Sequence, residues 1–311
     1  SYEDIVRIAE INGVKSVDFF QEYSLPKEDF SSTELQALLD CEYAESDISI
    51  GIIDGGISEE NEYLQPYIIA QEKYVYEEYR NPHHATFIAS TIQYGNLLNN
   101  ISSTTCHRFK FVDVIAIPNS DEEYGPTDTI SEYDLMEIIE EVMDKYSDTT
   151  KIWNLSLGIE SKRCSGAMSD LGIFLDYIQD KYQVQIFVSS GNVNDLPLRT
   201  WPPQIELGEH DRLISPADSV RAVTVGSVAL FESNDSIVKF NEPSPFSRRG
   251  PGANYVVKPD VVDYGGNLST SYCIDGLGVK GLDPQGNVIE GNGTSYSNPR
   301  ALQKFASICE E

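Results

Sequence analysis

Four side chains in this sequence have the chemistry that acyl transfer needs. They are Asp54, His84, Asn192 and Ser295, and three of them follow one another in the order aspartate, histidine, serine. A serine oxygen can attack a carbonyl, a histidine can take its proton, and a carboxylate can orient that histidine. An asparagine amide can donate a hydrogen bond to the oxyanion that forms. These residue types suit a nucleophilic hydrolase if the fold brings them together.

Ser295 stands where a loop meets an expected helix. Gly293 and Thr294 precede it. Apolar residues follow it at helical spacing, at Ala301, Leu302, Phe305 and Ile308. The first turn of a helix leaves backbone N–H groups without partners and carries the positive end of the helix dipole, which favours negative charge beside the serine oxygen. Taken alone, the pattern favours a simpler role, in which Thr294 or Ser295 only caps the helix.

The expected strands deliver these residues to one edge of a sheet. Residues 48–53 form a short apolar run rich in β-branched residues, typical of a buried parallel strand, and Asp54 follows at its carboxyl end. Residues 184–189 form another expected strand, which ends shortly before Asn192. Open α/β sheets build their sites at the carboxyl ends of such strands. His84 begins an expected helix that reaches about residue 94.

The alternation of strands and helices continues along the chain. Further elements are expected at 109–117, 151–157 and 222–228 for strands, and at 129–146 and 168–182 for helices. This alternation predicts an α/β fold with a mostly parallel sheet and helices on its faces. Residues 229–291 are expected to form hairpins and loops. No repeat or change of composition divides residues 45–311 into separate domains.

The net charge of the chain excludes some classes of binding partner. Its 311 residues include 50 acidic and 22 basic ones, for a formal net charge of -28. An acidic surface repels phosphate backbones and anionic membranes, so we expect neither nucleic acid nor membrane as a partner. The simplest purpose of the charge is solubility.

The spacing of the cysteines and the first residues of the chain indicate the cellular compartment. Five cysteines are widely spaced, and no two form a Cys-x-x-Cys pair, which argues against a disulfide scaffold or a structural zinc site. No apolar run approaches the length that spans a bilayer, and the first residues do not form a secretion signal. A cytoplasmic location is therefore the expectation.

The sequence resembles the subtilisin-like serine proteases, or subtilases, from about residue 48 to its end. The motifs that carry the resemblance follow one another in the family's order: Ile50-Gly51-Ile52-Ile53-Asp54-Gly55-Gly56, His84-Ala85-Thr86-Phe87, Asn154-Leu155-Ser156-Leu157-Gly158, Ser189-Ser190-Gly191-Asn192, Ser215-Pro216-Ala217, Phe246-Ser247-Arg248-Arg249-Gly250-Pro251, Lys258-Pro259-Asp260-Val261 and Gly293-Thr294-Ser295-Tyr296-Ser297-Asn298-Pro299. A single such motif is weak evidence, whereas this many in order are strong evidence. The resemblance implies a three-layer α/β fold.

The resemblance also implies roles for individual residues. Asp54, His84 and Ser295 would form the catalytic triad of a serine endopeptidase, and Asn192 would line its oxyanion hole. Four residues would bind the substrate backbone: Ser156, Leu157, Gly158 and Gly191. His84, and not its neighbour His83, is in register with the family's histidine motif, so His83 is expected to be solvated or structural.

The resemblance to the subtilases also gives expectations about domain limits and cofactors. Residues 1–30 are similar to the end of an inhibitory propeptide, although a plain N-terminal strand is an equal alternative, and residues 31–311 would be the catalytic domain. Since the family commonly adds packing elements after the serine helix, we expect a truncated C-terminus. A propeptide or partner domain is an expected partner beside a peptide substrate. No cofactor or metal is required; calcium is common in the family, but the loop at Asn96, Asn99 and Asn100 lacks carboxylates at fixed spacing.

Two departures from the family pattern support an alternative function. Gly55 stands where the family usually has a hydroxyl residue, so one hydrogen bond to the Asp54 carboxylate is expected to be missing. Ala85 replaces the usual glycine after the histidine. The alternative is a catalytically silent subtilase fold that binds peptides or partner domains. Two acidic residues, Glu160 and Asp195, continue the segments that would border the specificity pocket, and either would favour a basic side chain there if it faced the pocket.

Overall fold

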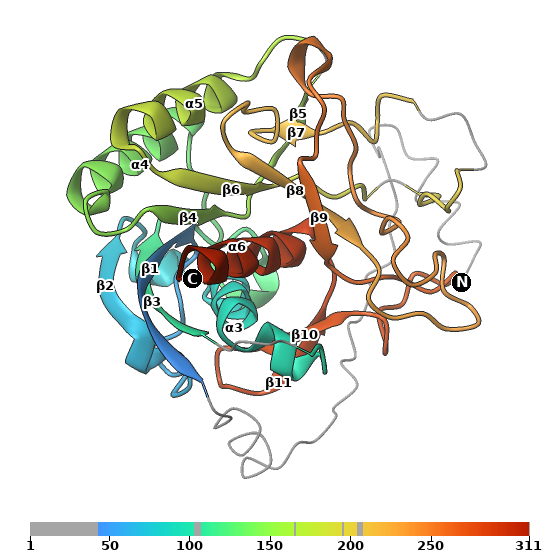
Figure 1. Ribbon diagram of the computed structural model, residues 1–311, viewed down its shortest axis with the longest axis horizontal. Coiled ribbons are helices and arrows are strands. Elements are labelled where there is room, and N and C mark those ends of the chain that lie inside the picture. Colours follow the sequence, from blue (N-terminus) through green and yellow to red (C-terminus); the bar gives the residue numbers. More distant parts are fainter. Residues whose placement is uncertain (1–42, 103–106, 165, 195, 204–207, 311) are drawn as a thin grey trace.

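A seven-stranded parallel sheet forms the centre of the protein (Figure 1). The computed structural model describes residues 43–102, 107–164, 166–194, 196–203 and 208–310. The strand order is β2-β3-β1-β4-β6-β8-β9, and every neighbouring pair in it is parallel. The strands are β1 (Ala44–Asp54), β2 (Ile68–Lys73), β3 (His107–Ile115), β4 (Ile152–Leu155), β6 (Gln185–Ser189), β8 (Val223–Val228) and β9 (Val261–Tyr264).

Helices cover both faces of this sheet, which confirms the predicted three-layer α/β fold. On one face lie α3 (His83–Leu98) and α6 (Thr294–Glu310), side by side in Figure 1; on the other lie α4 (Glu132–Tyr146) and α5 (Asp170–Tyr182). Alternate residues of β1 serve the two faces. Ile50 and Ile52 pack in the core under α3 and α6, and Ile53 packs in the core under α4 and α5. The sheet is thus buried on both sides, as its apolar strands predicted.

Local sequence explains where the outer helices begin. Ser131 caps α4 through a hydrogen bond from the backbone N–H of Asp134, and Ser169 caps α5 through one from Gly172. In the central strand β1, Gly51 leaves room for Trp153, because a Cβ atom there would lie 2.0 Å from the indole ring. Trp153 is fully buried.

The strands at the two edges were not predicted. The sequence pattern indicated no strand at β2, and it indicated only hairpins and loops between residues 229 and 291, where β9 adds a parallel edge strand. Edge strands face solvent on one side, so β2 carries Gln71, Glu72 and Lys73, and its pattern is not apolar. The hairpin expectation is right for β10 (Val279–Leu282) and β11 (Val288–Gly291). A short antiparallel pair joins β5 (Ile159–Arg163) to β7 (Ile214–Ser215).

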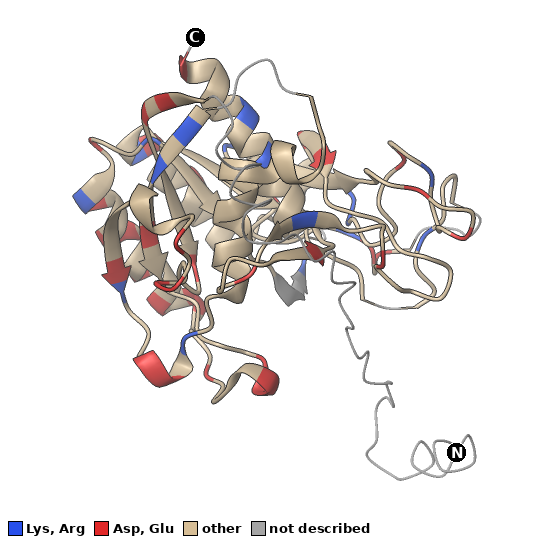
Figure 2. Cartoon of the chain, turned by 90° about the horizontal axis from the view of Figure 1, so that it is seen from below, with Lys and Arg blue, Asp and Glu red and all other residues tan. Residues whose placement is uncertain are grey.

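Two sequence predictions are not decided by the fold. All of the expected N-terminal segment, residues 1–30, and the start of the expected catalytic domain, residues 31–42, lie outside the described part of the chain. Within the described ranges, no helix is long and apolar enough to cross a membrane. Figure 2 shows acidic residues on many elements, with basic residues interspersed.

A buried carboxylate lies on β3 behind the loop that follows β1. Asp113 is 0% exposed and accepts hydrogen bonds from the Ile57 N–H at 3.1 Å and from Gln71 Nε2 at 2.9 Å. Burial raises the pKa of Asp113 to about 7; the two hydrogen bonds oppose the rise, and the nearby Asp54 carboxylate adds to it. The folded protein therefore retains this proton over a pH range in which an unfolded chain releases it.

Replacing Asp113 by Asn is expected to stabilise the protein increasingly as the pH rises. Between the ordinary pKa of 3.8 and about 7 only the folded state holds the proton, so wild-type stability falls with pH across this window. The advantage of Asp113→Asn should be small near pH 4 and grow to at most about 4 kcal/mol near pH 8. Urea unfolding of both proteins across this range measures it. A difference that stays constant with pH would contradict the assignment.

Candidate active site

The predicted site residues come from four separate elements that meet at one end of the sheet. Asp54 is the last residue of β1, and Asn192 follows β6. His84 lies in the first turn of α3, and Ser295 lies in the first turn of α6. Because α3 packs against α6 and the strands are parallel, their ends converge.

The structure joins Asp54 to His84 by hydrogen bonding. Nδ1 of His84 lies 2.8 Å from Oδ2 and 3.0 Å from Oδ1 of Asp54. The carboxylate is buried, with 5% of the residue exposed, whereas 38% of the imidazole side chain is exposed. A buried carboxylate on Nδ1 fixes the imidazole tautomer that leaves Nε2 unprotonated and free to accept a proton.

The pKa of His84 reflects two opposing effects. Burial by itself lowers the pKa, but the negative charge of Asp54 and its hydrogen bond raise it, and the pKa lies above the ordinary value of 6.5. The neighbouring His83 has a different environment. It packs against Tyr124 with ring centroids 4.3 Å apart and ring planes tilted by 38°, and burial lowers its pKa. Of the two roles expected for His83, solvated or structural, these contacts favour the structural one.

Ser295 lies close to the histidine helix. Its Oγ donates to the Ser156 carbonyl at 3.3 Å, and within the described residues no hydrogen bond links it to His84. The ring of its neighbour Tyr296 packs at a tilt against Phe87 of α3, with a centroid distance of 4.1 Å, and its centroid lies 5.9 Å from that of the His84 ring. Hydrogen bonds at such sites are often long before substrate binds.

The side-chain amide of Asn192 is held in one orientation. Its Oδ1 accepts hydrogen bonds from the backbone N–H of Thr294 at 2.9 Å and from the Thr294 hydroxyl at 3.0 Å. The same hydroxyl accepts a bond from the Gly191 N–H at 3.2 Å. Because Oδ1 is occupied, the donor of the amide is Nδ2, which lies next to Gly293. A Cβ atom built on Gly293 would lie 3.2 Å from this nitrogen. The amide can therefore donate toward a group beside Ser295.

The predicted substrate-binding residues form a continuous border beside this site. Gly158 is exposed and Leu157 half-buried, while Ser156 is buried. The Ile214 side chain lies between this segment and the Asn192 turn, because a Cβ on Gly158 would lie 2.5 Å from it and a Cβ on Gly191 2.6 Å from it. The Ile214 side chain therefore packs against both segments. A side chain at Gly191 would be strained as well as crowded, because its φ of +91° favours glycine.

A buried polar network below Ser295 was not predicted. Asn298, one turn along α6, donates through Nδ2 to Asn154 Oδ1 at 3.0 Å, to Ser156 Oγ at 3.1 Å and to the Phe187 carbonyl at 3.1 Å. Ser156 Oγ in turn donates to the Ser295 carbonyl at 3.2 Å. The network ties the start of α6 to β4 and β6. Asn298 and Thr294 both belong to the serine motif. Polar side chains in the first turns of a helix expected to be buried could have indicated that they form hydrogen bonds inside the protein.

The two departures from the family pattern leave the site intact. The Gly55 N–H donates to Asp54 Oδ1 at 2.7 Å, so the backbone supplies a hydrogen bond at this position. A Cβ on Gly55 would lie 2.5 Å from the Asn81 carbonyl, which leaves no room for a hydroxyl side chain. Ala85 is fully buried in the core under α3 and α6. Both residues fit their local packing.

Other predicted features fall outside this site. The side chains of Glu160 and Asp195 lie outside the described part of the chain. Two of the asparagines considered for calcium have side-chain oxygens with protein partners: Asn99 Oδ1 accepts from the Lys280 N–H at 2.8 Å, and Asn96 Oδ1, in the last turn of α3, accepts from Arg300 at 2.9 Å.

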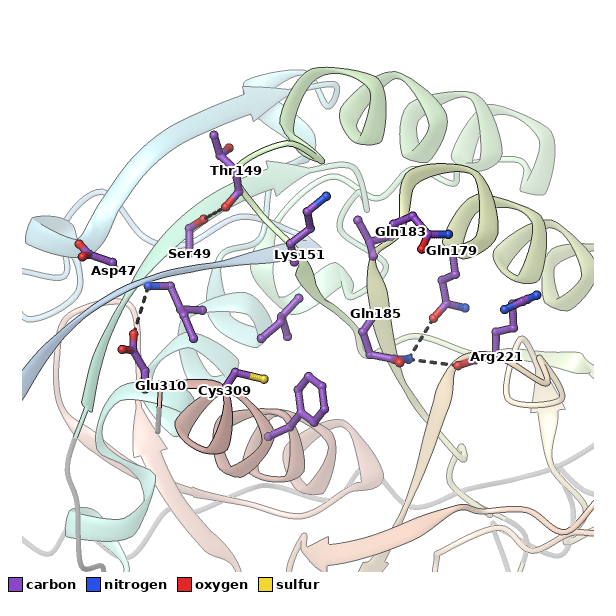
Figure 3. Close-up of a pocket in the computed structure, with 14 residues that line it drawn as sticks. Asp47, Ser49, Thr149, Lys151, Gln179, Gln183, Gln185, Arg221, Cys309 and Glu310 are labelled. Carbon is purple, nitrogen blue, oxygen red and sulfur yellow. Dashed lines mark hydrogen bonds between the residues drawn. The ribbon is translucent and has the colours of Figure 1, made fainter.

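A separate cavity of about 860 Å³ lies at the opposite ends of the strands (Figure 3). Its lining includes Ser49, Lys151, Gln185, Cys309 and Glu310, from the starts of β1, β4 and β6 and the end of α6. It contains none of the predicted site residues, which lie at the carboxyl ends of β1 and β6. The cavity therefore has no part in the chemistry of the candidate site.

Comparison with known proteins places the chain in a class. A sequence model of the Subtilase family, Peptidase_S8, matches residues 45–311. The chain therefore belongs to the subtilase family, the class of subtilisin-like serine proteases, which are hydrolases that act on peptides or proteins. An uncharacterized protein of Sinorhizobium fredii (strain NBRC 101917 / NGR234), y4bN, is 32% identical over 181 residues, which are 48% of this chain and 42% of that protein. The alignment thus spans less than half of that relative.

Solved structures agree with the fold. The protease domain of PatA, in a mutant form, has a TM-score of 0.54 at 16% identity and covers 87% of this chain and 82% of its own. A lanthipeptide protease has a TM-score of 0.54 at 18% identity, with 85% and 73% covered. A cold-adapted subtilisin-like serine proteinase has a TM-score of 0.51 at 19% identity, with 86% and 77% covered. At these identities the likeness concerns the fold alone.

The hydrogen bond between Asp54 and His84 leads to a prediction about pH. If His84 is the base of the reaction, it must be unprotonated to act, so peptidase activity should fall as the pH drops through its pKa, which Asp54 holds above 6.5. Asp54→Asn removes the charge and leaves the lowering effect of burial. We expect the acidic limb of kcat/KM to move to lower pH and kcat to fall about 10⁴-fold. A pH–rate profile measures both, and an acidic limb at the wild-type pH would contradict the coupling.

Proposed function

We propose that this protein is a serine endopeptidase in which Asp54, His84 and Ser295 act as a catalytic triad. The observation that carries the proposal is the 2.8 Å contact between the buried Asp54 carboxylate and Nδ1 of His84, beside the helix that presents Ser295. The family membership supports the same assignment. The alternative of a silent fold is less favoured, because Gly55 and Ala85, which suggested it, leave these contacts in place.

In the proposed reaction, Ser295 Oγ attacks the carbonyl carbon of the scissile peptide bond. Nε2 of His84 takes the serine proton as the new bond forms, and Asp54 stabilises the imidazolium. His84 then gives that proton to the leaving amine, which departs and leaves an acyl-enzyme on Ser295. Water attacks the acyl group with His84 again as base; His84 then gives this proton to Ser295 Oγ as the bond to the acyl carbon breaks, and the product carboxylate leaves. Because these steps use only the chain's own side chains and water, we propose that no cofactor takes part.

The oxyanion of each tetrahedral intermediate would be bound by the Asn192 Nδ2 amide and by the backbone N–H of Ser295. Thr294 supports this role, because its two hydrogen bonds to Oδ1 leave Nδ2 as the outward donor. The first turn of α6 adds the positive end of its dipole. The segment from Ser156 to Gly158, of which Gly158 is exposed and Leu157 half-buried, would pair with the backbone of the substrate on the side of this pocket.

The first test of the proposal concerns the nucleophile. Ser295→Ala should abolish peptidase activity, with a loss on the order of 10⁶ in kcat, and should abolish labelling by a fluorophosphonate, because both need the attacking oxygen. Ser297→Ala is a matched control, since that buried hydroxyl bonds the Thr294 carbonyl of its own helix. The control should still be labelled. Turnover retained in Ser295→Ala, or a wild-type protein that is never labelled, would refute the triad.

The second test concerns the oxyanion donor. Asn192→Ala should lower kcat by about 10²–10³ and change KM much less, since the amide is needed where charge develops and not in the ground state. Steady-state kinetics with a chromogenic peptide separate the two constants, and a thermal melt shows whether the turn still folds. A loss expressed mainly in KM would instead place Asn192 in a substrate pocket.

A further inference from the structure

A buried arginine lies directly behind the Asn192 turn. Arg248 is 4% exposed, and its guanidinium reaches three backbone carbonyls. Nε donates to the Asn192 carbonyl at 2.8 Å, and Nη1 donates to those of His210 at 2.7 Å and Arg212 at 3.1 Å. The side chain therefore connects the turn that holds the proposed oxyanion donor to a separate segment.

Burying a guanidinium is costly, so its placement requires strong partners. The planar group offers several N–H donors in a fixed geometry, which suits carbonyls that approach from different directions. The backbone around Arg248, at residues 246–248, also forms hydrogen bonds with the turn. The Arg248 N–H donates to the Gly191 carbonyl at 3.1 Å, and Val193 N–H donates to the Phe246 carbonyl at 2.8 Å.

The arginine side chain also shapes the turn by packing. Gly191 has a φ of +91°, in the left-handed region that favours glycine. A Cβ on Gly191 would lie 2.9 Å from Cδ of Arg248, so the arginine stem runs across the face of this glycine. Asn192 is thus held at two points: Thr294 bonds its side-chain oxygen, and Arg248 bonds its backbone oxygen.

We propose that Arg248 is a positioning residue that holds Asn192 in the geometry required to bind the oxyanion. This inference rests on the proposed peptidase function. Arg248 acts through Asn192 and touches no substrate atom in this scheme. Without the guanidinium, the Asn192 carbonyl loses a charged donor, and the turn loses its hydrogen-bonded link to residues 210–212. The Asn192 side-chain amide should then shift, which weakens its hydrogen bond to the oxyanion because that bond depends on the position of the donor.

A matched pair of arginine variants tests this role. Arg248→Met keeps the apolar stem and removes the donors, and we expect kcat to fall about 10-fold with KM within about twofold of wild type, because a displaced oxyanion donor costs part of the 10²–10³ that its removal costs. Arg249→Met is the control. Its side chain bonds Asp211, Gly208 and its neighbour Gly250, and in the part of the chain that the structure describes none of its hydrogen bonds reaches the Asn192 turn. The control should keep the wild-type kcat.

A double-mutant cycle shows whether the effect passes through Asn192. If it does, Arg248→Met should cause no further loss of kcat in the Asn192→Ala background. The affinity for a peptide aldehyde, whose adduct with Ser295 places an oxygen at the same position, should fall by the same factor as kcat in the single variant. Should Arg248→Met fail to fold, Arg248→Lys is measured in the same cycle, since one ammonium group cannot span the three carbonyls.

The outcomes separate this inference from the proposed function. A wild-type protein that neither cleaves peptides nor accepts a fluorophosphonate overturns the function itself. An active wild type whose Arg248 variants keep full kcat overturns only the positioning role. An equal loss of kcat in the presence and absence of the Asn192 amide also overturns it, because the arginine would then act elsewhere.

Discussion

The position of Ser295 depends on the burial of α6 in the middle of the molecule. This helix packs against β4, β6, β8 and β9 and beside α3. Two polar anchors fix it along its axis: Asn298 bonds β4 and β6, and Arg300, 2% exposed, pairs with the buried Asp263 of β9. Removing one member of such a buried pair typically costs about 3–5 kcal/mol, so the helix has little freedom to shift. The first turn of α6 is therefore held rigidly beside the carboxyl ends of the strands.

Within this frame, the Asp54–His84 pair and the Asn192 amide of the proposed site each have one end held by the protein and the other end available. The Asp54 carboxylate accepts from its own neighbour Gly55 and from Nδ1 of His84, which leaves Nε2 for chemistry. The Asn192 amide has its oxygen occupied by Thr294, which leaves its Nδ2 donor. Groups oriented before the reaction do not have to reorganise when charge develops.

Local sequence determined much of this architecture. The apolar strand ending at Asp54 was predicted because burial on both faces produces a continuous apolar run, and the helices were predicted because their apolar residues recur at helical spacing. The ordered motifs identified the family before any contact was known. The edge strands β2 and β9 were missed, because an edge strand faces solvent and its residues carry no regular apolar pattern.

Contacts between distant segments were decided only by the tertiary structure. Thr294 orients an amide 102 positions away, and Arg248 holds a carbonyl 56 positions away, and neither pairing leaves a local pattern in the sequence. The reason for a glycine at position 55 also became clear only from the tertiary structure. The sequence alone suggested a lost hydrogen bond, whereas the packed Asn81 carbonyl explains why a glycine is required. Sequence thus determined which residues could react and on which elements they lie. Packing of those elements decided how each is oriented, because hydrogen-bond geometry exists only once the chain has folded.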